Sequence, residues 1–310
     1  MTVQRTEEAS EDYRGIDAWS SADVLAAIVA SQRRAVAAVE AAVPALAAAG
    51  EAIADRLRLG GRLIYAGAGS SGLLAQVDAL ELPGTYGIPA DRVPVLLAGG
   101  QAALFTIPGD AEDDGDQAER DVEALRPSAA DALVAISASG RTPYAVAALR
   151  RAAALGALTV GIACNAGTPL LEEADHAVLL ATPPEVVAGS TRMNAGTAQK
   201  CALNMLSTLI GIRLGHVHDG LMVNLHADND KLRRRALGIV ARAAGVSEEA
   251  AAAALEAGAG NVKTAILLCA GAGSPREARD LLERRGGTVR AALAELAALT
   301  ELAAKSSKAG

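Results

Sequence analysis

Two short loops combine glycine with hydroxyl side chains, a pattern suited to binding an anion. Gly67–Gly72 reads GAGSSG and Ser137–Thr142 reads SASGRT, and each loop follows a short apolar run and precedes a helical segment. Glycine lets the backbone approach a ligand closely, and exposed amides at a helix start attract negative charge. No acidic ribose ligand follows the next apolar run, so we expect the loops to bind a phosphorylated small molecule rather than a dinucleotide.

A third polar cluster occupies the segment Val186–Thr208, which reads VVAGSTRMNAGTAQKCALNMLST. Hydroxyl, amide and cationic side chains, among them Ser190, Arg192 and Lys200, crowd into what we expect to be a helix start. A helix that is simply buried has no need of this mixture, whereas an anion site does. Glu185 directly precedes the segment, where it would either cap the helix or face the site.

Two carboxylates are candidates for proton transfer. Glu81 stands near the end of the helical segment after the first loop, in DALELPGTYG, and Glu112 stands in the acidic loop GDAEDDGD. Two carboxylates that face one substrate can divide acid and base work when their surroundings separate their pKa values. We expect the neighbouring Asp113, Asp114 and Asp116 to be solvated.

Neither a metal nor another cofactor is expected. Four histidines occur without a supporting cluster of cysteine or aspartate, and such a cluster is the usual mark of a metal site. They are His176, His216, His218 and His226. The three cysteines lie in apolar runs and lack C-x-x-C spacing, which indicates reduced core residues and a cytoplasmic location.

The overall composition argues against several classes of protein. The chain has 310 residues, of which 51% are hydrophobic and 2% aromatic, and its formal net charge is -7. Acidic and basic residues are interspersed, so we expect no nucleic-acid partner. The first residues are polar and acidic, and no uncharged apolar run reaches membrane-spanning length, so we expect neither a secretion signal nor a membrane partner.

The hydrophobic pattern predicts the elements that position these residues. Short apolar runs alternate with helical segments, which predicts a doubly wound α/β fold with a parallel sheet and helices on both faces. The runs are Arg62–Ala66, Val93–Leu97, Ala132–Ser137, Leu158–Ala163 and Ala177–Leu180.

Helices are also expected before and after this sheet-forming region in the sequence. Helical periodicity before residue 59, interrupted near Pro44, predicts N-terminal helices. Glycine-punctuated helical units, with Ser247 and Ser274 as N-caps, predict a small all-helical C-terminal domain. We therefore divide the chain into N-terminal helices (1–59), a ligand-binding domain (60–228) and a helical domain (229–310).

In combination, these segments resemble one known family. YAGAGSSG, DALELPGTYG, ISASGRTPYAVAAL, PPEVVAGSTRMNAGTAQKCALNMLST and GNVKTAIL occur in the order found in N-acetylmuramic acid 6-phosphate etherases. The likeness runs from about Arg62 to Thr288. ASGRTPY and STRMNAGTAQK are specific to that family and to its relative, the glucokinase regulatory protein, whereas the two loops alone indicate only the wider sugar isomerase (SIS) superfamily.

The resemblance implies a cytoplasmic SIS-domain homodimer, acting without a metal, that removes D-lactate from N-acetylmuramic acid 6-phosphate. The other product would be N-acetylglucosamine 6-phosphate, formed by elimination across carbons 2 and 3 of the open-chain sugar and then addition of water. The motif positions assign the catalytic acid to Glu81 and the second catalytic carboxylate to Glu112. They also imply substrate contacts from Ser70, Ser71, Ser137, Ser139, Thr142, Glu185, Ser190 and Arg192.

Three positions that the family occupies with charge differ here. Leu73 replaces the usual arginine after the first loop, Asn194 replaces a lysine, and Gly109 replaces the first acid of the acidic loop. We expect these positions to surround a single pocket, so the exchanges predict a changed substrate charge, above all at the lactyl carboxylate. Two alternative functions stay open: a sugar-phosphate-binding regulatory protein and an aldose–ketose phosphosugar isomerase.

Overall fold

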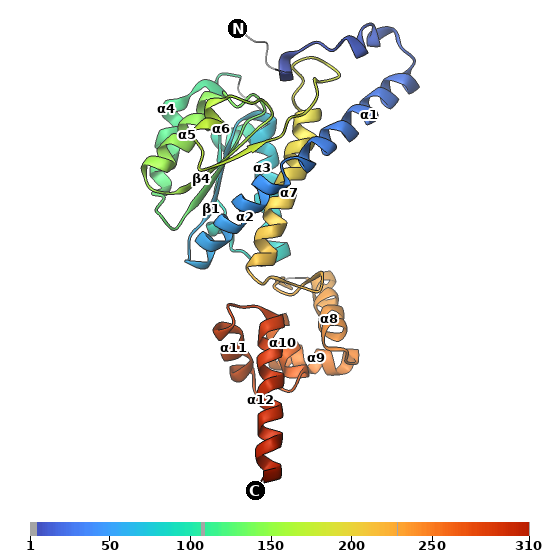
Figure 1. Ribbon diagram of the computed structural model, residues 1–310, viewed down its shortest axis with the longest axis vertical. Helices are drawn as coiled ribbons and strands as arrows, with labels where there is room; N and C mark the ends of the chain where they lie inside the picture. The colour runs from blue at the N-terminus through green and yellow to red at the C-terminus, as the bar shows by residue number, and fades with distance from the viewer. Residues whose placement is uncertain (1–4, 107–108, 228, 310) are drawn as a thin grey trace. The chain divides into compact units, whose positions relative to one another are not determined.

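The computed structural model describes residues 5–106, 109–227 and 229–309 (Figure 1). These residues pack into two compact units. The first comprises the chain up to Leu80 together with Ala90–Ile210, and the second comprises Glu81–Pro89 together with the chain from Gly211 onward. The three-part division at residues 59 and 228 stays a prediction.

A five-stranded parallel sheet forms the centre of the first unit. Its strands are β1 (Leu63–Gly67), β2 (Val95–Leu97), β3 (Ala132–Ile136), β4 (Leu158–Ala163) and β5 (His176–Leu179). Their spatial order is β2-β1-β3-β4-β5, so the sheet starts at the strand next to one edge, adds β2 at that edge, and then extends in the opposite direction from β3 to β5. Every residue of β1 and β3 is buried, as expected of strands covered on both faces. The predicted doubly wound α/β fold is confirmed.

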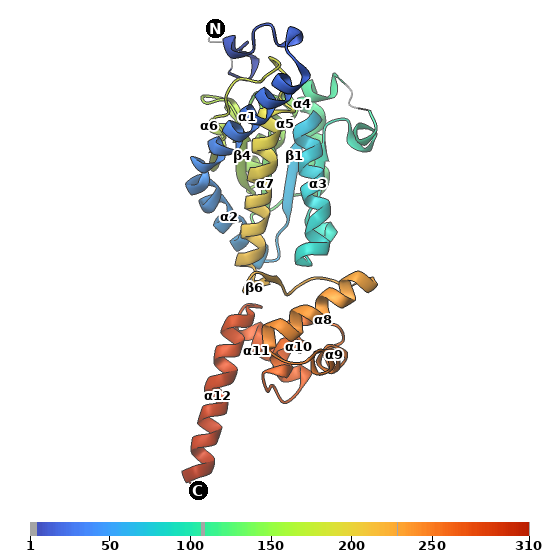
Figure 2. The same cartoon turned by 90° about the vertical axis from the view of Figure 1, so that its right-hand side faces the viewer.

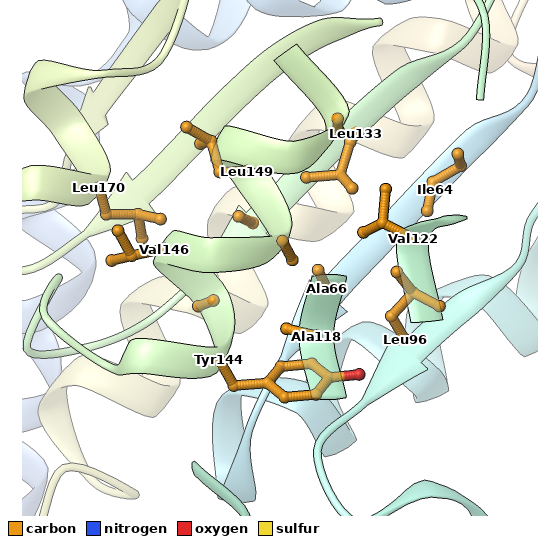
Figure 3. Close-up of a cluster of buried hydrophobic side chains, with 14 of the residues drawn as sticks. Ile64, Ala66, Leu96, Ala118, Val122, Leu133, Tyr144, Val146, Leu149 and Leu170 are labelled. Carbon is orange, nitrogen blue, oxygen red and sulfur yellow. The ribbon is translucent and has the colours of Figure 1, made fainter. Parts of the chain in front are cut away.

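Helices α4 (Gly115–Leu125), α5 (Pro143–Ala154) and α6 (Pro169–Glu172) cover one face of the sheet (Figures 1 and 2). Figure 3 shows the side chains between these layers: Ile64 of β1 and Leu133 of β3 point toward Val122 and Leu149 of the helices. Small alanines fill much of the remaining space, which brings helix and strand backbones close together.

The opposite face lies beneath α2 (Val43–Arg58), α3 (Gly69–Tyr86) and α7 (Asn194–Arg213), with α1 (Ser21–Glu40) beside α7 (Figure 2). A buried hydrogen-bonded cluster links this layer to the sheet. Tyr65 of β1 donates to Asp78 Oδ2 of α3 at 2.8 Å, and Ser207 of α7 donates to Asp78 Oδ1 at 3.1 Å. Burial, followed by the charge of Asp78 and this hydrogen bond, raises the pKa of Tyr65 well above its usual value.

The two N-terminal helices divide just before a proline. Ser20 caps α1 by accepting from the Asp23 amide at 3.2 Å, α1 ends at Glu40, and Pro44 stands in the first turn of α2. The proline therefore begins the second helix, where its missing N–H costs nothing. Within the described ranges no single helix is long and apolar enough to cross a membrane; α1 and α2 meet that test only jointly, across a 59° bend.

The described residues of the second unit form a hairpin and five helices, together with the end of α3. The five helices lie in the C-terminal region for which helices were predicted. The hairpin pairs β6 (Val217–His218) with β7 (Leu221–Met222). The helices are α8 (Asp230–Ala244), α9 (Glu248–Ala257), α10 (Val262–Cys269), α11 (Pro275–Arg284) and α12 (Val289–Ala309). Ser247 and Ser274 cap α9 and α11 as predicted, each accepting from the amide three residues ahead.

Short 3-10 turns join several of these elements. They are η1 (Arg5–Glu7), η2 (Glu11–Tyr13), η3 (Ile16–Ala18), η4 (Ala90–Arg92), η5 (Gly100–Leu104) and η6 (Ala111–Asp113). The first and the last of them reach the candidate site described below.

Candidate active site

A polar cavity of about 430 Å³ opens where β1 and β3 end at the carboxyl edge of the sheet. This edge is where ligands bind in doubly wound folds. Its lining residues are Glu7, Ala68, Gly69, Ser70, Ser71, Glu112, Asp113, Ser137, Ala138, Ser139, Arg141, Thr142, Pro143, Gly189 and Thr191. The cavity brings together both hydroxyl loops and one of the two carboxylates singled out from the sequence.

The first loop turns sharply from β1 into α3. A Cβ added to Gly72 would lie 2.5 Å from Leu97 Cδ1 and 2.8 Å from the Gly67 carbonyl oxygen, so only glycine fits there. The tight turn presents Ser70 and Ser71 to the cavity at the start of the helix. The Ser71 side chain is also fixed by α7, because its hydroxyl donates a hydrogen bond to Gln199 Oε1 of that helix at 2.9 Å.

The second loop is organised by its own hydroxyl groups. Ser137 Oγ lies 2.8 Å from Thr142 Oγ1 and 3.2 Å from Ser139 Oγ, and it accepts from the Gly140 amide at 3.0 Å. Gly140 adopts φ +70°, and a Cβ there would lie 2.3 Å from Thr168 Oγ1. Thr142 occupies the N-cap position of α5, but its side chain makes no capping bond to that helix. Its hydroxyl faces Ser137 instead.

The acidic residues are distributed between the two units. Glu112 and Asp113 stand on η6 and line the cavity with exposed side chains. Asp113 therefore lines the cavity, and its side chain is exposed to solvent as the sequence predicted. Asp114 caps α4, accepting from the Gln117 amide at 2.8 Å. Glu81 belongs to the second unit, where it is exposed near the end of α3, and it is not among the residues that line the cavity.

Glu185 lies buried beneath the start of α7, with 1% of its surface exposed. Its carboxylate accepts from the amides of Asn194 at 2.7 Å and Ala195 at 3.0 Å, which are two of the unpaired donors of that helix end. Burial raises the pKa of Glu185, and these two hydrogen bonds oppose the rise. Of the two roles left open by the sequence, the structure shows capping.

Ser190 and Arg192 stand in the turn that precedes α7. Ser190 joins the turn through its backbone, its amide donating to the Val187 carbonyl at 2.9 Å. Arg192 lines a second, less polar hollow of about 500 Å³ that adjoins the first cavity at Ser70. The other residues of this hollow are Leu73, Leu74, Val77, Gly196, Thr197 and Lys200.

The three positions that depart from the family pattern lie in three different places, so the expectation of a single altered pocket is wrong. Leu73 lines the second hollow. Asn194 is fully buried, and its side-chain amide donates to Ser31 Oγ of α1 at 2.7 Å and to the Pro184 carbonyl at 2.9 Å. Gly109 is exposed, with open space where a Cβ would stand. Asn194 thus serves packing between α1 and α7 rather than a ligand.

Thr191, which belongs to the polar segment Val186–Thr208, also lines the cavity, and so do Glu7 and Arg141, which were not singled out from the sequence. Arg141 carried a signal, because it lies inside the SASGRT loop, and its guanidinium now donates to the Gly167 carbonyl at 3.0 Å. Glu7 carried none, because it comes from a polar stretch far from the other site residues in sequence. No group of three or more His, Cys, Asp or Glu in the described part of the chain has the arrangement of a metal site.

Comparison with known proteins agrees with this architecture. Residues 27–164 match the SIS domain family. The chain is 46% identical over 296 residues to an N-acetylmuramic acid 6-phosphate etherase of Deinococcus radiodurans, covering 96% of this chain and 97% of that protein. A similarly named protein of Streptomyces avermitilis is 49% identical over 259 residues and is matched over 83% of both chains.

The fold also resembles that of a solved putative phosphosugar isomerase from Bacteroides fragilis. The TM-score is 0.50 at 22% identity, and the match covers 66% of this chain and 97% of that one. This likeness concerns the fold alone, whereas the sequence identity to the etherases extends over nearly the whole length of both proteins. The chain therefore belongs to the N-acetylmuramic acid 6-phosphate etherase family.

Proposed function

We propose that this protein is an N-acetylmuramic acid 6-phosphate etherase, a carbon–oxygen lyase that releases D-lactate and leaves N-acetylglucosamine 6-phosphate. The observation that carries the proposal is the cavity at the carboxyl edge of the sheet. Hydroxyl groups from two helix-start loops converge there beside Glu112. Hydroxyl and amide donors at helix starts suit a phosphate group, and a carboxylate beside them suits proton transfer to or from the attached sugar.

The reaction needs two proton-transfer groups. A base removes the proton on carbon 2, the electron pair forms the double bond to carbon 3, and an acid protonates the ether oxygen as D-lactate leaves. Water then adds to carbon 3 of the unsaturated aldehyde. We assign the proton donor to Glu81 and the second acid/base role to Glu112, as the family resemblance implies. Glu112 has the additional support that it lines the hydroxyl-rich cavity.

The phosphate would be bound by Ser70, Ser71, Ser137, Ser139 and Thr142. All five line the cavity. Ser190 and Arg192 remain proposed substrate contacts at its border. Support for Arg192 comes from the second hollow, which shares Ser70 with the cavity and also contains Lys200. A cation at this position suits an anionic substituent such as a lactyl carboxylate.

We further propose that the protein forms a homodimer and acts in the cytoplasm. Large apolar side chains are exposed along α1, α3 and α7, among them Leu25, Val29, Val77, Leu80 and Met205. These helices lie side by side (Figure 2), so together they offer a face that a second copy of the chain would cover. Mass measurement by light scattering tests the dimer. The three free cysteines accord with a reducing compartment.

Incubation with N-acetylmuramic acid 6-phosphate and enzymatic assay of free D-lactate tests the activity. Release that increases linearly with protein concentration supports the proposal. Interconversion of hexose 6-phosphates without lactate would instead identify a phosphosugar isomerase. Binding of the sugar phosphate without turnover, together with ligand-dependent capture of a protein, would identify a regulator. Either result contradicts the etherase assignment.

A further inference from the structure

The N-terminal turn η1 is fixed across the edge of the cavity by its central residue. Thr6 has 2% of its surface exposed, although Arg5 and Glu7 on either side are exposed. Its carbonyl accepts from the Gly189 amide at 3.1 Å, its hydroxyl accepts from Asn165 Nδ2 at 3.1 Å, and its amide donates to Asn165 Oδ1 at 3.4 Å. Thr6 is therefore bound to the loop after β4 and to the loop before α7.

This anchoring places Glu7 among the residues that line the cavity. The position of a Cβ on Gly189 would lie 3.0 Å from Glu7 Oε2, so the carboxylate lies directly against the backbone of that loop. Gly189 has φ +75°, and the absence of a side chain leaves room for the carboxylate. The Glu7 side chain makes neither a hydrogen bond nor an ion pair with any other residue that the structure describes. An acceptor at the edge of a polar cavity is thus left available to a ligand.

The chemistry of a carboxylate limits what part of a ligand it can contact. An ionised carboxylate only accepts hydrogen bonds, and it repels a phosphate dianion. The donors suited to phosphate come from the two hydroxyl loops, as argued above. A phosphorylated amino sugar, however, also carries hydroxyl and amide N–H donors along its carbon chain. Those donors match an unpaired carboxylate, and hydrogen bonds to a charged acceptor are among the stronger ones.

We propose that Glu7 is a specificity-determining residue that binds the hydroxyl or amide N–H donors of the sugar, away from its phosphate. The proposal rests on the proposed function, because it assumes that a phosphosugar occupies the cavity. It extends that function by assigning to the N-terminal turn a direct part in distinguishing a sugar phosphate from phosphate alone. Glu7 lies outside the SIS domain match, which begins at residue 27, and outside the two hydroxyl loops within that match.

Two probes separate the contact to the sugar from the contact to the phosphate. Calorimetric titration with N-acetylglucosamine 6-phosphate and with inorganic phosphate would compare the full-length wild type with Glu7→Gln. The matched control is Glu8→Gln, which neutralises an exposed neighbour that does not line the cavity. We expect Glu7→Gln to weaken binding of the sugar phosphate about ten-fold or more, since it weakens a charge-assisted hydrogen bond. We expect the affinity for inorganic phosphate to stay as in wild type or to increase, because the variant removes a charge that repels the anion. We expect the thermal midpoint to stay as in wild type.

A second variant tests the anchoring. Thr6→Val removes the hydroxyl that accepts from Asn165 and keeps a similar side-chain volume. We expect it to weaken sugar phosphate binding in the same selective way, because the turn no longer fixes Glu7 against Gly189. The kinetic counterpart in Glu7→Gln is a raised KM for N-acetylmuramic acid 6-phosphate with a much smaller change in kcat.

Equal affinity of Glu7→Gln and wild type for the sugar phosphate would overturn the inference and leave the proposed function intact. Equal weakening for sugar phosphate and inorganic phosphate would also overturn it, because Glu7 would then only shape the cavity. A wild-type protein that binds no phosphosugar would remove the proposed function and, with it, this inference.

Discussion

Glu185 Oε2 accepts a hydrogen bond from the Asn194 amide at 2.7 Å, and this contact fixes the point where α7 begins. The side chain of the same Asn194 donates to Ser31 of α1, so one residue connects the helix cap to a neighbouring helix. The polar character of the segment before α7 thus has two origins. Some of its residues face a cavity, and others complete the hydrogen bonds of a buried helix end.

The first prediction concerns this cap. Glu185→Gln retains the size of the side chain but replaces one acceptor oxygen with an NH2 group, so one helix-end amide loses its partner. We expect the free energy of unfolding to fall by about 1 to 3 kcal/mol, measured by urea denaturation. Glu40→Gln, an exposed change at the end of α1, should have little effect. Loss of phosphosugar affinity without loss of stability would contradict the capping role.

A second prediction concerns the hydroxyl loop Ser137–Thr142. Gly140→Ala would bring a methyl group to within 2.3 Å of Thr168 Oγ1 at a backbone angle of φ +70°. We expect the loop to shift, with a loss of stability of about 1 to 3 kcal/mol from overpacking and at least ten-fold weaker binding of inorganic phosphate. Gly60→Ala is the control, because Gly60 has φ +87° but open space around it. It should lose some stability and keep its phosphate affinity.

A third prediction uses a buried lysine of the second unit. Burial lowers the pKa of Lys263 to about 8, while its ammonium donates to the Gly287 carbonyl at 2.9 Å. In an unfolded chain the value is about 10.4, so the folded state disfavours the charged form. Below pH 8 this costs stability, and the cost is relieved as pH rises from about 8 to about 10, by up to about 3 kcal/mol.

The relevant comparison is between Lys263→Met and wild type in urea denaturation at several pH values. We expect the stability of wild type to rise relative to the variant over that interval. Lys231→Met changes an exposed lysine on α8 and should keep the pH dependence of wild type. A constant difference between Lys263→Met and wild type at every pH would show that burial leaves this ammonium group unperturbed.

The fourth prediction concerns proton transfer. Glu112→Gln should lower kcat by about a hundred-fold or more, because the amide cannot exchange a proton at neutral pH. Affinity for N-acetylglucosamine 6-phosphate should change by only a few-fold, since the phosphate donors remain. Asp116→Asn, an exposed acid in the first turn of α4, should turn over like wild type. Undiminished turnover by Glu112→Gln would remove this residue from the mechanism.

The sheet and the two hydroxyl loops could be predicted because their signals are local. Strands buried on both faces appear as short continuous apolar runs, and all five predicted runs overlap the observed strands. Gly72 and Gly140 stand where a Cβ would collide with neighbouring atoms, which is why glycine accompanies the hydroxyl residues in both loops. The N-caps of α9 and α11 are also local, because each serine accepts a hydrogen bond from the amide three residues ahead.

The remaining features depend on contacts between distant parts of the chain. Asn194 and Ser31 are 163 positions apart, and the hydrogen bonds of Thr6 to Asn165 span 159. No local sequence pattern predicts such pairs. Neither the burial of Asn194 between α1 and α7 nor the position of Glu7 in the cavity therefore followed from the sequence. The same reason explains why Leu73, Asn194 and Gly109 were expected together and are found apart.

The most direct test of the account follows the oxygen atoms of the reaction in water enriched in oxygen-18. Elimination breaks the bond between carbon 3 and the ether oxygen, so D-lactate keeps the original oxygen and the added water supplies the new hydroxyl of the sugar. We predict unlabelled D-lactate and labelled N-acetylglucosamine 6-phosphate in equal amounts, measured by mass spectrometry. Labelled lactate, or no lactate from folded wild-type protein at any concentration, would contradict the account.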